Sequence, residues 1–458
     1  MPARILSIGT ALPATRLPQE HVRDLFAAQP GVDRLTRRLI HAAFDAAAID
    51  SRRTVLAALA PEGGALAPGG GGVLAPGGAD APGSGAAPGS GGDAPGGTAL
   101  ASGGGAALAS RGGVVDERMP VRDAAGVLLR PSTGTRNAAY VRLAPPLFAG
   151  AARRALAGAG VERGEVTHVV TVSCTGLFAP GPDYRLVRDL GLPAGTERFH
   201  LGFVGCAAAL PALRLAAALC AADPAAVVLV ACAELCTLHF RPSADPEQIV
   251  AASVFADGAA AAVVTARADL TARHDGATLE LDRFGTTLTR EGEADMAWTI
   301  GDAGFEMTLS AEVPRIIGRE IRGAVGDFLA GERPDRWAVH PGGRSVLDRV
   351  EAGLDLPPAA LAPSRTVLRE HGNMSSATIL FILARMLDEP ADADAARVAA
   401  LAFGPGLTVE SAMLTLRGGA GAEGAASVGA REAAAVGAGV GARGAAAVAA
   451  GTAAESRR

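Results

Sequence analysis

The stretch LGFVGCAAALPALRLAAAL, residues 201–219, decides how the chain is interpreted. Small residues surround Cys206, and the apolar run 207–222 follows it at once, which predicts a buried helix that begins just after the cysteine. Free backbone N–H groups and the positive dipole end at a helix start favour a thiolate and lower the pKa of the thiol. A thiolate attacks thioesters and carries acyl groups. The alternative is a small cysteine buried in the core.

Strand-like and helix-like stretches alternate around this segment. An apolar helix is predicted for 374–387, and a strand, a tight turn and a second strand for 397–416. This order occurs in both halves of the chain, so we expect α/β layers with helices on both faces of the sheets. Such folds bind ligands where strands end. The predicted buried strands are VTHVVTVSC (166–174), AAVVLVACAELC (225–236), GAAAAVVTA (258–266) and RWAVH (336–340).

Composition narrows the class of protein. The 458 residues are 49% hydrophobic and 19% charged, which is typical of a globular chain, and a net charge of −5 gives no electrostatic case for nucleic acid. An uninterrupted apolar run of about 18 residues would predict a membrane span, and the sequence contains none. The start, MPARILSIGTALPA, is interpreted as a strand and turn, with a signal peptide as the alternative. Five cysteines without CxxC pairs indicate a reducing, cytoplasmic location and no metal site.

Two segments have the composition of low-complexity sequence. Residues 61–113 hold 20 glycines in 53 positions, and residues 418–458 hold 10 in 41. Because so little there can pack, we expect both to be disordered. They are either expansions without function, or a spacer and a docking segment.

Two further residues complete a set of groups for acyl transfer. His340, in WAVHPGGRSVLDRVE, ends a predicted strand before a Pro-Gly-Gly turn, and Asn373, in REHGNMSSATILFIL, precedes an apolar helix. A histidine and a neutral amide donor can polarise a thioester carbonyl and hold the enolate of a decarboxylated malonyl thioester. Taken singly, His340 is equally well a buried structural residue and Asn373 an N-cap.

At these residues the sequence resembles the type III polyketide synthases, the chalcone/stilbene synthase superfamily. The resemblance runs from Arg4 to about Arg417 and is interrupted by the insertion at 61–113. Three stretches look most like bacterial enzymes that make alkylpyrones, alkylresorcinols or alkylresorcylic acids from fatty acyl starters: STGTRNAAY (132–140), CAELCTLHFRP (232–242) and WTIGDAGFEMTLS (298–310). The stretches that carry the family match are VSCTGLFAPGPDYRLVRDLGL, GCAAALPALRLA, VFADGAAAAVV, WAVHPGGRSVLDRVE, HGNMSSATILFIL and FGPGLTVES.

The resemblance implies a thiolase-like fold: two similar βαβ-rich halves, layered α/β/α/β/α, in an obligate homodimer. It implies that Cys206 carries the acyl group and that His340 and Asn373 serve decarboxylation and oxyanion binding. Phe255 matches the gatekeeping aromatic between CoA tunnel and acyl cavity, and the loop 403–410 shapes that cavity. The residues expected to line the cavity are Cys174, Thr175, Cys236, His239, Trp298, Met307 and Ser375.

Acyl-CoA and malonyl-CoA are the implied substrates, used without a carrier protein, cofactor or metal. The family's basic residues for CoA phosphates are only partly visible in FDAAAIDSRRTV (44–55), where Arg52 and Arg53 are the candidates, with a solvated surface pair as the alternative. Gly342 and Gly343 are the other candidates for CoA contact.

The domain boundaries follow from the same matches. Residues 1–60 and 114–267 are expected to form the N-terminal half with the nucleophile, and 268–417 the C-terminal half with His340 and Asn373. Two other functions stay open at this point: an initiating ketoacyl synthase that takes malonyl groups from acyl carrier protein, and a catalytically inactive thiolase-fold partner protein.

Overall fold

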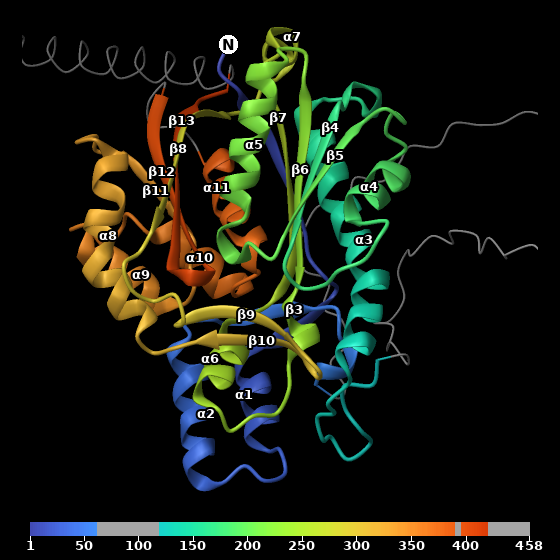
Figure 1. Ribbon diagram of the computed structural model, residues 1–458, viewed down its shortest axis with the longest axis vertical. Helices are drawn as coiled ribbons and strands as arrows, with labels where there is room; N and C mark the ends of the chain where they lie inside the picture. Colours follow the sequence, from blue (N-terminus) through green and yellow to red (C-terminus); the bar gives the residue numbers. More distant parts are fainter. Residues whose placement is uncertain (62–118, 390–394, 420–458) are drawn as a thin grey trace, which may run out of the picture.

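A nine-stranded mixed sheet runs through the computed structural model, which describes residues 1–61, 119–389 and 395–419 (Figure 1). Its strand order is β11-β12-β13-β8-β1-β7-β6-β4-β5. The strands are β1 Arg4–Ala11, β4 His168–Ser173, β5 Glu197–Gly202, β6 Val227–Leu235, β7 Asp257–Thr265, β8 Thr278–Leu288, β11 Arg336–Val339, β12 Ala395–Gly404 and β13 Thr408–Arg417. Two small antiparallel pairs are formed by β2 Thr15–Pro18 with β3 Ser51–Thr54, and by β9 Met296–Gly301 with β10 Gly304–Leu309.

The sheet consists of two halves with a narrow junction. β1 pairs with β7 along most of its length but meets β8 only through Arg4 with Glu280 and Ile5 with Leu279. Because so few pairs cross this junction, the halves diverge and leave room for helices between them. One half contains β1, β4, β5, β6 and β7. The other half contains β8, β11, β12 and β13.

Helices cover both outer faces and fill the space between the halves. α3 Thr133–Ala159 packs on β1, β6 and β7, whereas α8 Val313–Leu329 packs on β8 and β13. Between the halves lie α5 Ala209–Ala222 and α11 Thr378–Asp388, each in contact with strands of both (Figure 1). The predicted α/β/α/β/α layering is confirmed. The other helices are α1 Gln19–Ala27, α2 Arg34–Ala46, α4 Pro182–Leu190, α6 Pro246–Val254, α7 Ala268–Arg273, α9 Arg344–Gly353 and α10 Ala362–His371.

The predicted buried stretches lie where the pattern put them. The run 225–236 forms β6, which is buried along its whole length because helices cover both faces. Among the described residues, Gly205–Ala222 is long and apolar enough to cross a membrane, and more than half of it is buried between the sheet halves. A core helix meets the same criteria, so this finding decides nothing about membranes. The predicted disordered segments lie outside the described residues, apart from Pro61, Gly418 and Gly419.

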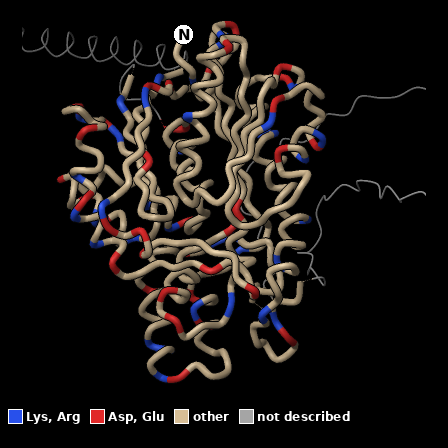
Figure 2. The backbone as a smooth tube through the Cα atoms, in the orientation of Figure 1, with Lys and Arg blue, Asp and Glu red and all other residues tan. Residues whose placement is uncertain are grey.

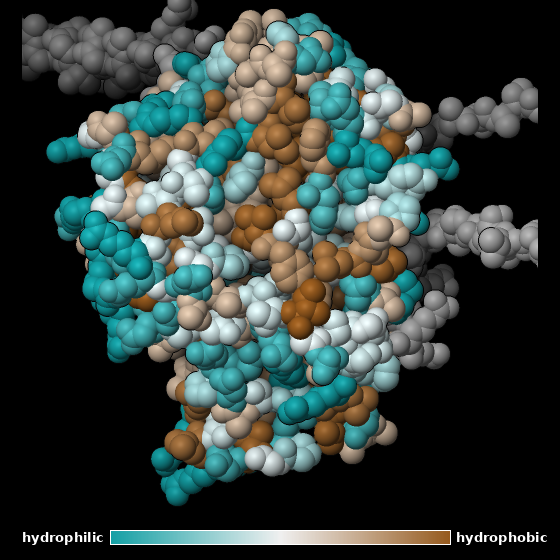
Figure 3. Space-filling view, viewed as in Figure 1, coloured by the Kyte–Doolittle hydropathy of each residue, from teal (hydrophilic) through white to brown (hydrophobic). Residues whose placement is uncertain are grey.

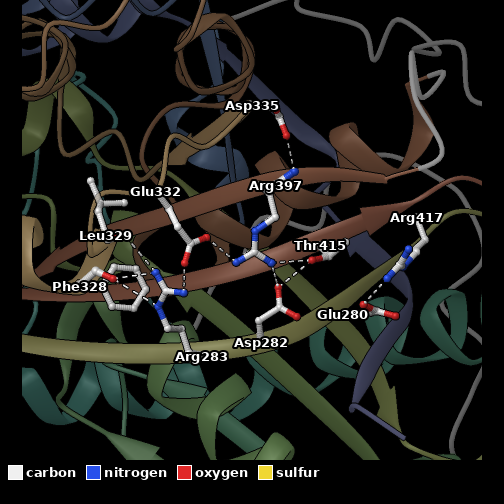
Figure 4. A network of polar contacts seen from close by, with 10 residues as sticks. All are labelled: Glu280, Asp282, Arg283, Phe328, Leu329, Glu332, Asp335, Arg397, Thr415 and Arg417. Carbon is white, nitrogen blue, oxygen red and sulfur yellow. Dashed lines mark hydrogen bonds and ion pairs between the residues drawn. The ribbon is translucent and has the colours of Figure 1, made fainter.

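All positive side chains other than histidine are arginines, because the chain has 42 basic residues and no lysine. Charged residues concentrate on the outer helices and loops (Figure 2). On the outer side of the C-terminal half, Arg283 donates to the carbonyl of Phe328 at 2.8 Å, and Arg397 pairs with Glu332 at 2.8 Å (Figure 4). This network ties β8 and β12 to the end of α8. Being partly exposed, each of its ion pairs is worth about 1 kcal/mol or less.

We predict that Gly9→Ala destabilises the fold. A Cβ at Gly9 of β1 would lie 2.3 Å from the backbone nitrogen of Ala155 and 2.4 Å from the carbonyl of Ala151 on α3, so the helix must move away from the sheet. Such overpacking costs about 1–3 kcal/mol, which urea unfolding can measure. Gly164→Ala is the matched control, since nothing lies within 4 Å of its added Cβ. Equal stability of the two variants would show that β1 and α3 do not pack this closely.

Candidate active site

The predicted nucleophile lies on a one-turn helix between β5 and α5. Cys206 is 8% exposed and belongs to η3 Gly205–Ala207. Gly205 has φ +79°, and a Cβ there would lie 2.1 Å from Cδ of Pro405. Only glycine fits, therefore, both for the backbone angle and for the space. The loop expected to shape the cavity thus packs directly against the turn that carries the cysteine.

Burial sets the protonation of Cys206. It raises the pKa of the thiol to about 11, with the buried Glu234 acting in the same direction, while hydrogen bonds with Ser375 and Asn373 oppose the rise. The prediction that the helix start yields a thiolate is therefore wrong for the free protein. Desolvation is the largest contribution to this rise. The resting group is a protonated thiol that needs a base.

Asn373 is held by backbone contacts on both sides. Its N–H donates to the carbonyl of Val254 and its carbonyl accepts from Ala256 N–H, both at 2.8 Å. Its side-chain oxygen accepts from the Ser375 N–H at 2.8 Å, so its amide NH₂ is left to donate to the sulfur of Cys206. Asn373 lies between two helices, not at a strand end, and the N-cap of α11 is Ala377. The bond from the Ser375 N–H nevertheless gives the Asn373 side chain a capping role at the start of the one-turn helix η5 Ser375–Ala377, which leads into α11.

His340 follows β11 and is completely buried. Its backbone N–H donates to the carbonyl of Leu401 at 2.8 Å, on β12, and β12 packs against η3, which carries Cys206. Neither ring nitrogen has a hydrogen-bond partner in the described part of the chain. Burial lowers the pKa of this histidine to about 3, so the ring is neutral at physiological pH. A neutral, unpartnered imidazole can accept a proton or hydrogen-bond a substrate oxygen.

The sulfur of Cys206 faces a cavity of about 680 Å³, its open mouth included. Its walls are largely apolar, with Ala251, Ala252, Met296 and Phe305 as members that were not predicted. Gln248 and Arg241 add polar groups near the rim. The predicted residues that line it are Cys174, Cys236, His239, Phe255, Trp298, Met307 and Ser375.

Hydrogen bonds fix one wall of this cavity. The ring of His239 stacks on Phe305 with centroids 4.4 Å apart, accepts from the Phe305 N–H at 3.0 Å and contacts the Thr175 carbonyl at 2.9 Å. Burial lowers the pKa of His239 to about 3. Trp298 Nε1 donates to the carbonyl of Cys174 at 2.7 Å. The shape of this wall is therefore set by the protein.

The sequence reasoning missed Glu234, a fully buried carboxylate at the end of β6. It accepts from Cys174 N–H at 2.9 Å, from Thr175 Oγ1 at 2.9 Å and from Ser376 Oγ at 2.5 Å. Burial raises its pKa and these donors oppose the rise. Thr175 must be corrected: its hydroxyl binds Glu234 and does not line the cavity. The available signal was one acidic residue in the otherwise uncharged strand VVLVACAEL.

A second, larger groove lies beside the cavity. It measures about 1290 Å³ with its open side, and Met296 lines both spaces. Gly342 and Gly343, the other predicted CoA contacts, line this groove together with Arg344 and Arg349. In the described ranges no group of three or more His, Cys, Asp or Glu side chains is arranged to hold a metal ion.

Arg52 is a correction to the predicted CoA contacts. It is 0% exposed, and its guanidinium donates to the backbone carbonyls of Ala252 and Phe255 at 2.7 Å each. A buried guanidinium bonded in this way is not free to meet a phosphate, and the surface-pair alternative fails for it too. Arg53, the next residue, is partly exposed and donates to the Ala14 carbonyl.

Comparison with known proteins agrees with this fold and site, which define an acyl-transferring enzyme of the polyketide synthase type. Residues 123–268 match the family model for the N-terminal domain of chalcone and stilbene synthases, and residues 280–417 match that for the C-terminal domain. The chain therefore belongs to the chalcone and stilbene synthase family, the type III polyketide synthases.

Two named relatives show similar sequences. The chain is 34% identical over 303 residues to bisdemethoxycurcumin synthase of Oryza sativa subsp. japonica, covering 62% of this chain and 74% of that protein. It is 32% identical over 298 residues to probable polyketide synthase 1 of Dictyostelium discoideum, covering 61% of this chain but only 9% of that much longer protein.

Two solved structures share the fold. PKS-I of the brown alga Ectocarpus siliculosus superposes with a TM-score of 0.73 at 25% identity, over 91% of this chain and 98% of that one. The C-terminal type III polyketide synthase domain of Steely1, a type I/III hybrid from Dictyostelium, gives 0.71 at 24% identity, over 91% and 99%.

His239 and His340 predict a pH dependence of stability. Each has a folded pKa of about 3 against an ordinary value of about 6.5. Below about pH 6.5 these histidines are protonated in the unfolded chain but stay neutral in the folded chain. The free energy of unfolding therefore decreases as the pH is lowered, by up to about 1.4 kcal/mol per pH unit for each histidine. In His239→Gln and His340→Gln the fall between pH 6.5 and 4 should be shallower. Urea unfolding, referenced for each protein to its own value at pH 8, measures this, and curves parallel to wild type would contradict it.

Proposed function

We propose that this chain is a CoA-dependent type III polyketide synthase that loads a fatty acyl starter on Cys206 and extends it with malonyl-CoA. The observation that carries the proposal is the thiol of Cys206 on a largely apolar cavity, hydrogen-bonded to Asn373 and Ser375. A nucleophile alone would serve many reactions. A nucleophile beside an amide donor and an enclosed apolar space suits a growing acyl chain.

The proposed roles of Cys206, His340 and Asn373 follow from their protonation states. His340, neutral and without a partner, accepts the proton of the Cys206 thiol as the sulfur attacks the starter thioester, and it returns that proton to the sulfur of the departing CoA. The carbonyl oxygen that becomes negative is stabilised by the amide of Asn373. The same amide holds the enolate left when malonyl-CoA loses carbon dioxide, and that enolate attacks the Cys206 thioester. A neutral amide suits this step because it does not protonate the carbanion.

The cavity lining supports an alkyl starter. Cys174, Cys236 and Ala251 are small, and Met296 and Met307 are flexible, so the space can adapt to an unbranched chain. Cyclisation to an alkylpyrone or an alkylresorcinol follows two or three extensions. An aromatic starter is the alternative outcome of the assay below.

The remaining parts of the proposal concern partners and location. We expect a cytoplasmic homodimer that uses acyl-CoA and malonyl-CoA directly, without a cofactor. Leu177, Val204 and Ile300 are exposed apolar residues of the kind that a second copy would cover. Apolar side chains also gather near the middle of the face seen in Figure 3.

The central experiment separates decarboxylation from condensation. Cys206→Ala should abolish product formation from acyl-CoA and malonyl-CoA yet keep part of the malonyl-CoA decarboxylation, because the enolate site remains. Asn373→Ala should lower decarboxylation by about 10²–10³, the usual cost of losing an oxyanion donor. Mass spectrometry of products from acyl-CoAs of graded length, with benzoyl-CoA included, identifies the starter.

The matched control is Cys220→Ala, a buried cysteine outside the cavity whose sulfur lies 3.9 Å from the Val264 carbonyl. It should keep wild-type products. Two outcomes would contradict the proposal. One is condensation by Cys206→Ala, and the other is wild-type protein that neither decarboxylates malonyl-CoA nor becomes acylated. Extension only from malonyl-acyl carrier protein would favour the ketoacyl synthase.

A charge test addresses the second groove. Arg344 and Arg349 are exposed there and have no hydrogen bond or ion pair within the described part of the chain, so they are free for the phosphates of CoA. Arg344→Gln with Arg349→Gln should raise KM for acyl-CoA about tenfold and leave kcat unchanged. Arg322→Gln, on α8 and paired with Asp355, is the control. The N-acetylcysteamine thioester of the same acid, which lacks the phosphates, should show no change; an equal rise for both thioesters would contradict the assignment.

A further inference from the structure

Arg52 has an unusual environment for a guanidinium. Besides the carbonyls of Ala252 and Phe255, it donates through Nη2 to the carbonyl of Ser253 at 2.5 Å and to the side-chain oxygen of Gln19. Gln19 in turn donates to the same Ser253 carbonyl at 2.9 Å. Three of these four hydrogen bonds go to one short backbone segment, residues 252–255, whereas Nε of Arg52 has no hydrogen-bond partner in the described part of the chain.

This segment is the end of α6 and the residue that follows it. The last carbonyls of a helix lack partners within the helix, and a cation near them also opposes the helix dipole. Phe255, the expected gate of the acyl cavity, is the C-cap residue of α6 and lines the cavity. Arg52 thus caps the helix from inside the protein and fixes the backbone at Phe255.

Asn373 binds the same segment through its backbone. Its backbone bonds with Val254 and Ala256 pair it with Phe255 in an isolated parallel bridge. The preceding Gly372 has φ +74°, and a Cβ there would lie 3.1 Å from both the Val254 carbonyl and the Ala256 side chain. The contact is so close that a shift of residues 254–256 must shift Asn373 as well.

Arg52 has no ion pair in the described part of the chain: burial lowers its pKa to about 9, and the charge of Asp257 opposes that fall. Asp257, also completely buried, favours the charged form of Arg52 and accepts from the Val55 N–H at 2.9 Å and from the Thr237 N–H at 2.8 Å. The Phe44 ring centroid lies 5.8 Å from the guanidinium carbon. Arg52 is therefore enclosed on all sides by fixed groups, as a positioning element requires.

We infer that Arg52 is a positioning residue, which sets the place of both the gate Phe255 and the oxyanion donor Asn373 through the segment 252–256. This inference rests on the proposed function for the roles of those two residues. It assigns Arg52 to neither substrate nor CoA. Its loss should act on two separable properties, the selection of starter length and the hydrogen bond from Asn373 to the sulfur of Cys206.

Two measurements test the role of Arg52, and neither would change if the substitution only reduced the amount of folded protein. In Arg52→Met the ratio of turnover with butanoyl-CoA to turnover with dodecanoyl-CoA should change at least threefold, because Phe255 is released. The pH midpoint of Cys206 alkylation by iodoacetamide, followed by peptide mass, should rise because the Asn373 donor is displaced. Arg52→Lys should lie between wild type and Arg52→Met, since an ammonium group cannot span three carbonyls as a guanidinium does.

Controls separate the possible outcomes. Arg283→Met removes another arginine that donates to backbone carbonyls, those of Phe328 and Leu329, at the distant end of α8, and should leave both readouts at wild-type values (Figure 4). If Arg52→Met does not fold, Arg52→Lys and Gln19→Leu decide by the same readouts. A folded variant with the ratio within twofold of wild type and an unchanged midpoint would overturn the inference. Wild-type protein without turnover would overturn the proposed function instead, and the alkylation midpoint would still test Arg52.

Discussion

The close contact between Gly205 and Pro405 is the constraint on which the site depends. Gly205 belongs to the N-terminal half, beside the nucleophile, and Pro405 to the loop between the last two strands of the C-terminal half. The sheet pairs the two halves only briefly at β1 and β8, so this contact determines how the halves meet around Cys206. Gly205, Cys206 and Pro405 all line the cavity, so this contact closes one part of its wall.

Enclosure has opposite effects on the acid and the base. Removal of water disfavours the charged form of each, so it raises the pKa of the Cys206 thiol and lowers that of His340. Both groups therefore rest in their neutral forms. The hydrogen bonds from Asn373 and Ser375 reduce the cost of forming the thiolate. The empty site is thus protected from unproductive reactions of a free sulfur anion.

The sequence predicted the layering and several buried strands but not β5 or β8, because a valine-rich apolar run such as 225–236 favours a strand covered on both faces. Most of the cavity residues followed from the family resemblance. The sequence failed where a property depends on distant segments. The site around Cys206 includes a loop about two hundred residues away, and the bonds of Glu234 come from the residues after β4 and from Ser376. Arg52 and Arg53 looked alike, but they lie on the short strand β3, where neighbouring side chains point to opposite faces. Without knowing that strand, their different burial could not be predicted.

The absence of lysine has a practical consequence for work on this protein. Thioesters react slowly with ε-amines, and such background acylation normally obscures the covalent intermediate of an acyl-transferring enzyme. This chain has no lysine side chain, and a guanidinium remains protonated and unreactive at neutral pH. Added mass after incubation with a thioester therefore reports chiefly on sulfur, and all five thiols, buried as they are, lie within the described fold.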